Sequence, residues 1–388
     1  MARECFFTDE HNMFRESVRR FVQKEIAPHV DQWEAQGCYD KSIFKRMGDL
    51  GFLGLSYPVE YGGQAADIRT SIVFWEEICR SGSLGFAMST LVHTDMASPA
   101  LAHAGGEYLR EKFLKPACRG DILLAIAITE PDHGSDVASM KTRAVLEGDH
   151  YRVNGTKMFI TNGTQADAIN TVVRTGGPGH RGVSLLVIET DTPGFSVGRK
   201  LEKMGLHASD TAELVFEDCM VPKENLIGEE GYGFYHLMKG LERERLAGCA
   251  LAYMGAEMAL DEAMKYALQR TQFGRPIMAF QAVNHMIAEM ATDLEAGKRL
   301  AYHAAAMADA GIRCNKEVSM AKLFCSEMAL RVVDKAVQIH GGYGLMKEFL
   351  VERIYRDVKL FTIGAGTSQI QKNIIISEMG GRDWVDGF

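Results

Sequence analysis

The segment Tyr151-Arg-Val-Asn-Gly-Thr-Lys-Met-Phe-Ile160 has the strongest local β signal of the chain, in a region where helical patterns give way to β patterns after about residue 120. Apolar and polar residues alternate on both sides of Asn154-Gly155, which is the pattern of half-buried strands. Asn-Gly is also the pair most favoured in two-residue hairpin turns. We therefore predict a β-hairpin that turns at Asn154-Gly155.

Short apolar runs on either side of this segment predict further strands. They lie at 122–128, 171–174, 184–189 and 213–216, with glycine and proline between them. No long crossover helix separates the runs, and parallel neighbours would need such connections. We therefore predict a mainly antiparallel middle unit.

Helical periodicity dominates the rest of the chain. Thr8 can cap a first helix, whose apolar residues recur every three or four positions until Pro28 closes it. Further helices are predicted near 41–50, 67–80 and 85–118, and then at 232–269, 280–309 and 315–339. The fold class is α+β, with an N-terminal helical domain (1–120), a middle β domain (121–230) and a C-terminal helical bundle (231–388).

Composition narrows the function. The chain of 388 residues has 51 acidic and 43 basic residues, a net charge of −8, and this balance provides no basic face for nucleic acid. The 8 cysteines are scattered and no metal-ligand spacing occurs, so we predict no metal site. We expect no membrane span, since no uncharged run is long enough. The N-terminal Met1-Ala-Arg-Glu-Cys5 resembles no targeting signal, so we expect a bacterial cytoplasmic protein, or a mitochondrial matrix protein if the chain is a processed form.

One acidic residue interrupts an apolar helix face. Glu244 shares a narrow arc with Leu237, Leu241, Gly248, Leu251 and Gly255, and the two glycines leave room beside it. A carboxylate there loses hydration, so its pKa rises and it becomes a candidate proton acceptor. The alternative is a structural ion pair with Arg243, Arg245 or a neighbouring helix.

Three other polar motifs have two readings each. Ser135 could present a hydroxyl to a ligand or lie in an ordinary loop after a strand. His340, in a glycine-rich segment, could be functional but is more often a packed histidine. The segment 364–369 could bind an anion at a helix start, or be a turn with Thr367 or Ser368 as N-cap.

Five motifs together resemble the acyl-CoA dehydrogenase family over essentially the whole chain. They are Ile128-Thr-Glu-Pro with Gly-Ser-Asp136, Asn154-Gly-Thr-Lys-Met-Phe-Ile-Thr-Asn162, Arg270-Thr-Gln-Phe-Gly274, Gln338-Ile-His-Gly-Gly342 and Gly366-Thr-Ser-Gln369. The resemblance implies the acyl-CoA dehydrogenase fold, with a β-barrel-like middle domain and a C-terminal four-helix bundle. It also implies a bound FAD.

The resemblance assigns two sets of FAD-binding positions. One set would surround the isoalloxazine ring: Ile126, Ile128, Thr129, Gly134, Ser135, Phe159 and Thr161. Phe159 stands where many relatives have tryptophan, and Asp132-His133 replaces the usual small residues. The other set would bind FAD across a subunit boundary or reach its adenosine half: Arg270, Phe273, Gln281, Gln338, His340, Gly341, Gly342, Thr367 and Gln369. Shared sites imply a homo-oligomer, a tetramer.

The position of the catalytic base departs from the commonest family pattern. Most relatives have glutamate directly before the Gly-Thr pair, whereas this chain has Ala365. The isovaleryl-CoA and long-chain branches place the base on the preceding helix, directly before an arginine, and Glu244-Arg245 matches that pattern. Likeness to these branches implies that Glu244 is catalytic and that Ser135, Glu242, Arg245, Ala365 and Gly366 contact the substrate.

The implied activity is dehydrogenation of an acyl-CoA to a trans-2-enoyl-CoA, with electrons passed to an electron-transfer flavoprotein. The alternatives are an acyl-CoA oxidase, a non-catalytic flavoprotein on the same scaffold, and a flavoenzyme acting on a substrate other than a thioester. The acyl chain itself is not specified by these motifs.

Overall fold

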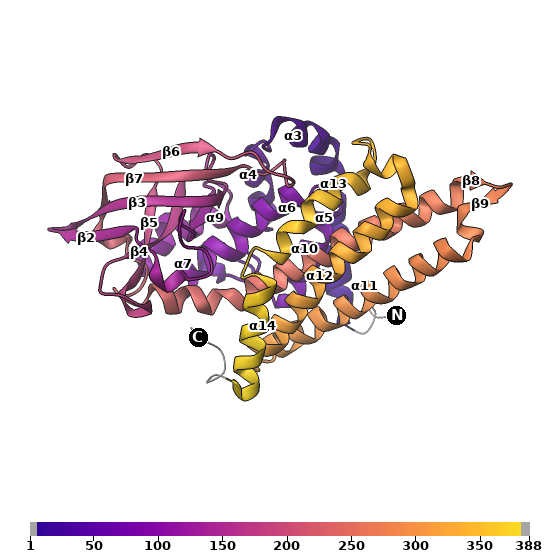
Figure 1. Ribbon diagram of the computed structural model, residues 1–388. Coiled ribbons are helices and arrows are strands. Elements are labelled where there is room, and N and C mark those ends of the chain that lie inside the picture. The colour runs from indigo at the N-terminus through magenta and orange to yellow at the C-terminus, as the bar shows by residue number, and fades with distance from the viewer. Residues whose placement is uncertain (1–5, 382–388) are drawn as a thin grey trace.

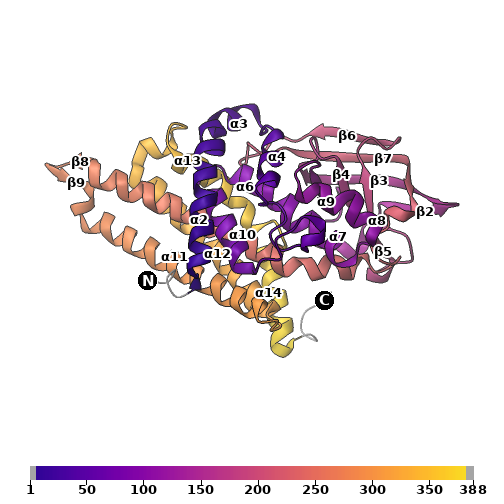
Figure 2. The same ribbon diagram turned by 180° about the vertical axis from the view of Figure 1, so that it is seen from behind.

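The computed structural model describes residues 6–381 and has the predicted order of helices, β structure and helices. The first five residues and the last seven, which belong to the outer ends of the first and last predicted domains, lie outside the described residues. The sheet forms one end of the molecule and the C-terminal helices form the other (Figure 1). Seen from behind, the N-terminal helices lie across both parts (Figure 2).

The N-terminal part is built from short helices. Thr8 caps α2, as predicted, in a capping box with His11. Pro28 does not end the run, because it lies at the start of the short helix η2, where a missing N–H is tolerated, and the backbone stays helical to Gln36. The helical segments are α2 (Asp9–Phe21), η1 (Val22–Ile26), η2 (Ala27–His29), α3 (Val30–Gln36), α4 (Ser42–Asp49), η3 (Val59–Tyr61), α5 (Ile68–Cys79), α6 (Leu84–Leu91), η4 (Val92–Ala97), α7 (Ser98–Ala104), α8 (Glu107–Leu109), η5 (Arg110–Leu114) and α9 (Lys115–Cys118).

Seven strands form one curled sheet in the middle of the chain. They are β1 (Leu124–Ala127), β2 (Arg143–Glu147), β3 (His150–Thr161), β4 (Ala168–Arg174), β5 (Val183–Glu189), β6 (Phe195–Lys200) and β7 (Thr211–Pro222), with short helices η6 (Val137–Ser139), η7 (His180–Gly182) and η8 (Lys223–Asn225). Their order is β1-β4-β2-β3-β7-β6, and β5 pairs with β4. Most pairs are antiparallel, as predicted. However, β4 runs parallel to β1 and, at one position, to β2, so the antiparallel prediction was incomplete.

The predicted hairpin turn at Asn154-Gly155 is wrong. β3 continues through both residues, and the pairing with β7 shifts there, which marks a β-bulge. The Asn154 side chain accepts the Asp218 N–H at 2.9 Å and donates to the Asp218 carboxylate at 3.0 Å, which fixes the bulge. Gly155 has φ +148°, and a Cβ there would lie 2.6 Å from Thr142 Oγ1. The hairpin turn lies earlier, between β2 and β3, where Gly148 has φ +63°.

Three long helices form the C-terminal part, at the predicted positions. They are α10 (Gly233–Gln269), α11 (Gln281–Asp309) and α12 (Asn315–His340), followed by η10 (Gly341–Leu345), α13 (Leu350–Asp357), η11 (Val358–Thr362), α14 (Ser368–Ile376) and η12 (Ser377–Gly381). The small strands β8 (Thr271–Gln272) and β9 (Arg275–Pro276), with η9 (Ile277–Ala279), join α10 to α11. α10 contacts both β5 and β9, so it runs from the sheet to the opposite tip (Figure 1). Between residues 6 and 381, no helix has the length and hydropathy needed to cross a membrane.

Candidate active site

Glu244 lies on α10 with only 6% of its surface exposed. The arginines beside it are engaged elsewhere, because Arg243 pairs with Asp95 at 2.5 Å and Arg245 donates to Asn315 at 3.2 Å. Among the described residues, no hydrogen bond or ion pair within 4.0 Å engages the Glu244 carboxylate. Residues 6–381 therefore contain no ion pair of Glu244, which was the structural alternative for this residue.

Burial changes the acidity of Glu244. Loss of hydration raises its pKa to about 7, against the opposing positive charges of Arg245 and Lys322, while Asp95 adds a smaller upward shift. A carboxyl group with a pKa near 7 exchanges protons readily at neutral pH. Glu244 thus has the environment of a general base.

The two glycines predicted to leave room beside Glu244 differ. A Cβ at Gly248, one turn along α10, would meet no other atom within 4 Å. A Cβ at Gly255 would lie 3.0 Å from Val358 Cγ1 and 3.1 Å from Leu84 Cδ1, so this glycine permits close packing instead. Only Gly248 provides open space next to the carboxylate.

The loop 364–367 has an unusual backbone. Ala365 and Gly366 have φ angles of 56° and 85°. Their N–H groups donate to no other residue in the described part of the chain. Thr367 caps α14 by accepting the Ile370 N–H at 3.2 Å, which is the N-cap reading of this motif. Gln369 lies exposed in the first turn of α14.

Two buried side chains that the sequence reasoning missed hold this loop. Lys322 on α12 donates to Gly366 O at 2.6 Å, and Gln371 on α14 donates to both Ala365 O and Gly366 O at 3.1 Å. Lys322 also influences the acidity of Glu244, which connects the loop to α10. A lysine within the apolar stretch Val318–Ala329 of α12 was the available sequence signal, by the same reasoning that identified Glu244.

A second group of predicted residues lies in the β part. Ile126 is in β1, and Ile128, Thr129, Gly134 and Ser135 follow it in one loop. This group approaches α10, because Ile126 and Leu237 belong to one buried cluster and Ile128 packs against it. Phe159 and Thr161 are on β3, and Met158 N donates to Thr129 O at 2.8 Å, so the loop and strand are joined.

An internal ion pair fixes the loop that carries Thr129 and Ser135. Glu130 accepts the N–H groups of Lys141 and Thr142 at 2.6 and 2.8 Å, and the Lys157 ammonium at 3.0 Å. Lys157 also donates to Ile128 O at 2.9 Å. Asp132 and His133 are accommodated in a tight turn, in which Glu130 and His133 exchange two backbone hydrogen bonds.

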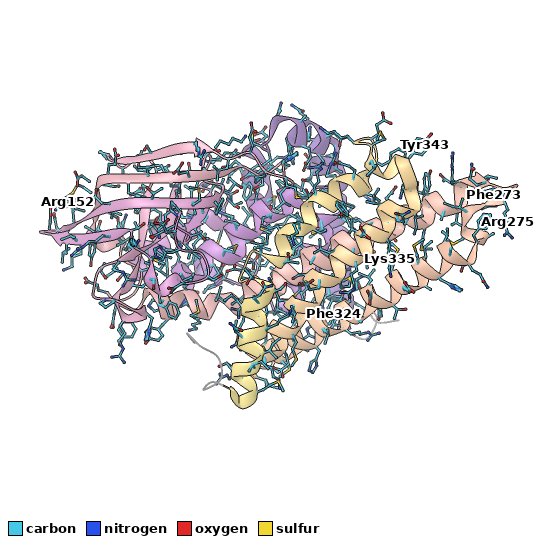
Figure 3. The ribbon with its side chains drawn as sticks, viewed as in Figure 1. Arg152, Phe273, Arg275, Phe324, Lys335 and Tyr343 are labelled. Carbon is cyan, nitrogen blue, oxygen red and sulfur yellow. The ribbon has the colours of Figure 1, made fainter. Side chains whose placement is uncertain are left out.

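The third group of predicted residues lies at the opposite tip of the molecule. Arg270 and Phe273 flank β8, and Gln281 begins α11. Gln338, Gly341 and Gly342 are exposed at the end of α12, whereas His340 is packed, with its ring stacked on Tyr266 at 4.4 Å. Arg270 lies 5.7 Å from the Tyr343 ring, which joins the two segments. The sheet and this tip lie at opposite ends of the molecule, as the positions of Arg152 and Phe273 show (Figure 3).

These groups fit a flavin in two respects. The hydroxyls of Thr129, Ser135 and Thr161 have no hydrogen-bond partner in the region the structure describes, so they are available to a ligand. Phe159 is 66% exposed although it is a large aromatic residue, and its φ of 63° is strained for such a residue. An exposed ring held by a strained backbone is suited to contact a planar group.

Comparisons with known proteins cover nearly the whole chain. Three domain profiles match: acyl-CoA dehydrogenase, N-terminal domain (residues 8–121), middle domain (125–219) and C-terminal domain (231–380). An acyl-CoA dehydrogenase of Bacillus subtilis is 43% identical, covering 95% of this chain and 97% of the relative. The caffeyl-CoA reductase-Etf complex subunit CarC of Acetobacterium woodii is 41% identical, covering 95% and 98%. The crystal structure of an acyl-CoA dehydrogenase from Geobacillus kaustophilus superposes with a TM-score of 0.94 at 44% identity, covering 96% and 99%.

The sequence resemblance and the predicted fold are both confirmed by these matches. The order of N-terminal helices, curled sheet and C-terminal helices agrees with the order of the three matched domains. The chain belongs to the acyl-CoA dehydrogenase family.

Proposed function

We propose that this protein is an FAD-dependent acyl-CoA dehydrogenase that converts an acyl-CoA to a trans-2-enoyl-CoA, with Glu244 as the base. The proposal depends on one observation. Glu244 is buried, has no ion-pair partner among the described residues, and has a pKa raised to about 7. At the position where most of the family has its base, this chain has Ala365. The small residues of 364–366 and the open side of Gly248 leave space for a thioester next to this carboxylate. The placement of the base agrees with the isovaleryl-CoA and long-chain branches of the family.

The residues around the proposed substrate have separate tasks. Glu244 removes the α-proton. The N–H groups of Ala365 and Gly366 have no acceptor within residues 6–381 and would bind the thioester oxygen, where negative charge develops as the proton leaves. Arg245, whose buried Nε has no partner in the part of the chain that the structure describes, would bind a polar part of the substrate, as would Ser135 and Glu242. Bound FAD would supply the acceptor for the hydride that leaves the β-carbon.

The cofactor would be held by residues from two copies of the chain. Thr129, Ser135, Phe159 and Thr161 lie in the β part, whereas Arg270, Phe273, Gln281 and the 338–342 segment lie at the far tip. Phe273 is 91% exposed, which suits a residue that completes its contacts on a second subunit. We therefore propose a homo-oligomer, a tetramer, in which Thr367 and Gln369 reach the adenosine half of FAD.

The physiological setting follows from the family. We propose that an electron-transfer flavoprotein accepts the electrons, since the relative from Acetobacterium woodii is named as a subunit of a complex with Etf. The described cysteines are all free, which is typical of a reducing compartment and supports a cytoplasmic location. The domain boundaries proposed from the sequence, at 120/121 and 230/231, are supported by the extents of the three matched profiles.

The decisive test is a Glu244→Gln variant loaded with FAD. A panel of acyl-CoAs is mixed anaerobically with each protein, and bleaching of the flavin absorbance is followed. We expect the wild type to bleach with at least one acyl-CoA and the variant to react at least about a thousandfold more slowly, because the amide cannot accept the α-proton. A variant that binds FAD normally and reacts at the wild-type rate would exclude Glu244 as the base.

A second candidate function is the reverse reaction, reduction of an aryl-substituted enoyl thioester. The relative named as a caffeyl-CoA reductase subunit, 41% identical to this chain, favours this direction. Both directions would use Glu244, since the same proton is removed or returned. Rates of oxidation of an acyl-CoA and reduction of the matching enoyl-CoA by one preparation would separate the two. Rapid reaction of the reduced enzyme with oxygen would indicate an oxidase instead.

A further inference from the structure

The loop 364–367 cannot owe its shape to its own sequence alone. A positive φ is routine for glycine but unfavourable for alanine, and Ala365 has φ 56°. The following residue, Gly366, has φ 85°. Two consecutive residues in this conformation need support from the surrounding structure.

That support comes from two side chains on separate helices. Lys322 of α12 is 3% exposed and reaches Gly366 O at 2.6 Å. Gln371 of α14 is fully buried, and its amide nitrogen lies 3.1 Å from both Ala365 O and Gly366 O. A Cβ at Gly366 would lie 2.8 Å from Gln371 Nε2, so a side chain at this position would displace the amide that holds the loop.

These contacts engage the carbonyl groups of Ala365 and Gly366, and among the described residues the N–H groups of these two residues have no acceptor. We propose that Lys322 and Gln371 are positioning residues that hold the 364–367 loop so that the N–H groups of Ala365 and Gly366 point at the thioester carbonyl. This inference rests on the proposed function. Neither side chain is assigned to substrate contact; each acts through the backbone that it holds.

The charge of Lys322 gives it a second effect, on Glu244. The charged groups that act on the Glu244 carboxyl are Arg245 on α10, Lys322 on α12 and Asp95 on η4. The Lys322 ammonium lowers the pKa of Glu244, opposing the larger upward effect of burial. Loss of this positive charge would therefore move the pH at which the base becomes active upward, which a merely structural residue would not do.

The experiment compares FAD-loaded wild type with Lys322→Met and Gln371→Leu. Each protein is assayed for kcat and KM, for the pH profile of kcat/KM, and for the infrared frequency of a ¹³C-labelled thioester carbonyl. The probe is 2,2-dimethylpropanoyl-CoA, which has no α-proton and cannot react. The matched control is Lys203→Met, which removes another desolvated lysine that donates to a main-chain carbonyl, Ser209 O, away from the loop.

In the wild type we expect the bound carbonyl to absorb at a lower frequency than in solution, because the N–H groups polarise it. In Lys322→Met we expect this shift to fall by at least half, kcat to fall about ten- to a hundredfold with little change in KM, and the pH profile to move upward. Gln371→Leu should reduce the shift and kcat without moving the pH profile. Lys203→Met should match the wild type in all three measurements.

Wild-type carbonyl frequency and kcat in both Lys322→Met and Gln371→Leu would overturn the proposal. If Lys322→Met does not load FAD, Gln371→Leu decides alone, and wild-type values in it would also overturn the proposal. A wild type that neither bleaches with acyl-CoAs nor shifts the carbonyl contradicts the proposed function itself. Active wild type with unaffected variants contradicts only the positioning role.

Discussion

Glu130 and Glu244 are nearly equally buried, at 5% and 6% exposure, but their surroundings are opposite. Glu130, in the loop after β1, accepts hydrogen bonds from Lys141, Thr142 and Lys157. Burial favours its neutral form, yet the Lys157 charge and these hydrogen bonds outweigh burial and lower its pKa to about 2. Glu244 has no such partners, so burial dominates and raises its pKa to about 7.

The difference indicates that pairing, and not burial alone, determines whether a buried carboxylate stays charged or can change its charge near neutral pH. Glu130 is fixed in its charged form and ties together the loop that carries Thr129 and Ser135. Glu244 is free to change its charge, which is what removal of a proton requires. The structural role of Glu130 and the proposed catalytic role of Glu244 can be tested separately.

The largest effect on stability is expected from breaking the buried pair. Glu130→Gln leaves the fully buried Lys157 ammonium without a countercharge, so we expect a loss of about 3 to 5 kcal/mol in the free energy of unfolding, measured with denaturant. The double variant Glu130→Gln/Lys157→Met should recover a large part of this loss. The control is Glu147→Gln, which removes an exposed carboxylate paired with Arg152 and should change stability by less than about 1 kcal/mol. Equal effects at the two sites would contradict the role given to Glu130.

Both glutamates also show how far sequence reasoning reaches. Glu244 could be identified because the apolar residues around it are on the same helix, at spacings that a sequence displays. The partner of Glu130 is Lys157, 27 positions away on another strand, and no local pattern connects them. The contact of Lys322 with Gly366 could not be predicted for the same reason, since the two residues lie 44 positions apart. The apolar surroundings of Lys322 on its own helix were visible in the sequence.

The fold, too, could be predicted where its signal is local and not where it depends on residues far away in the sequence. The long helices α10, α11 and α12 were predicted within a few residues, because helical periodicity is local. The strand character of β3 was also evident, but its Asn154-Gly155 bulge depends on Asp218 of β7, 64 positions away. An Asn-Gly pair is the same in a turn and in a bulge, and only the partner strand distinguishes them.

A smaller effect is expected from the pH dependence of stability at Glu244. The pKa is about 7 in the folded state and 4.5 in the reference state, so the folded protein binds this proton more tightly. Stability is unaffected below pH 4.5, falls as the pH rises from 4.5 through 7, and is lower by about 3 kcal/mol above that range. Glu244→Gln removes this penalty, so the variant should be more stable than the wild type at pH 8.5 but not at pH 4.5. Denaturant unfolding at both pH values checks this, and a pH-independent difference would contradict the raised pKa.

The smallest change in stability is expected when alanine replaces either of the two glycines on the Glu244 face of α10. Gly248→Ala adds a methyl group that meets no atom within 4 Å, so the higher helix propensity of alanine should stabilise the protein by about 1 kcal/mol. Gly255→Ala places its methyl group 3.0 Å from Val358 and 3.1 Å from Leu84, and this crowding should outweigh the gain in propensity by about 1 kcal/mol. Thermal unfolding measures both changes.

Because the new methyl group at position 248 occupies space beside Glu244, Gly248→Ala should also slow flavin bleaching by bulky acyl-CoAs more than by small ones. Gly255→Ala should leave that preference unchanged, and the opposite pattern would place the acyl group elsewhere on the helix.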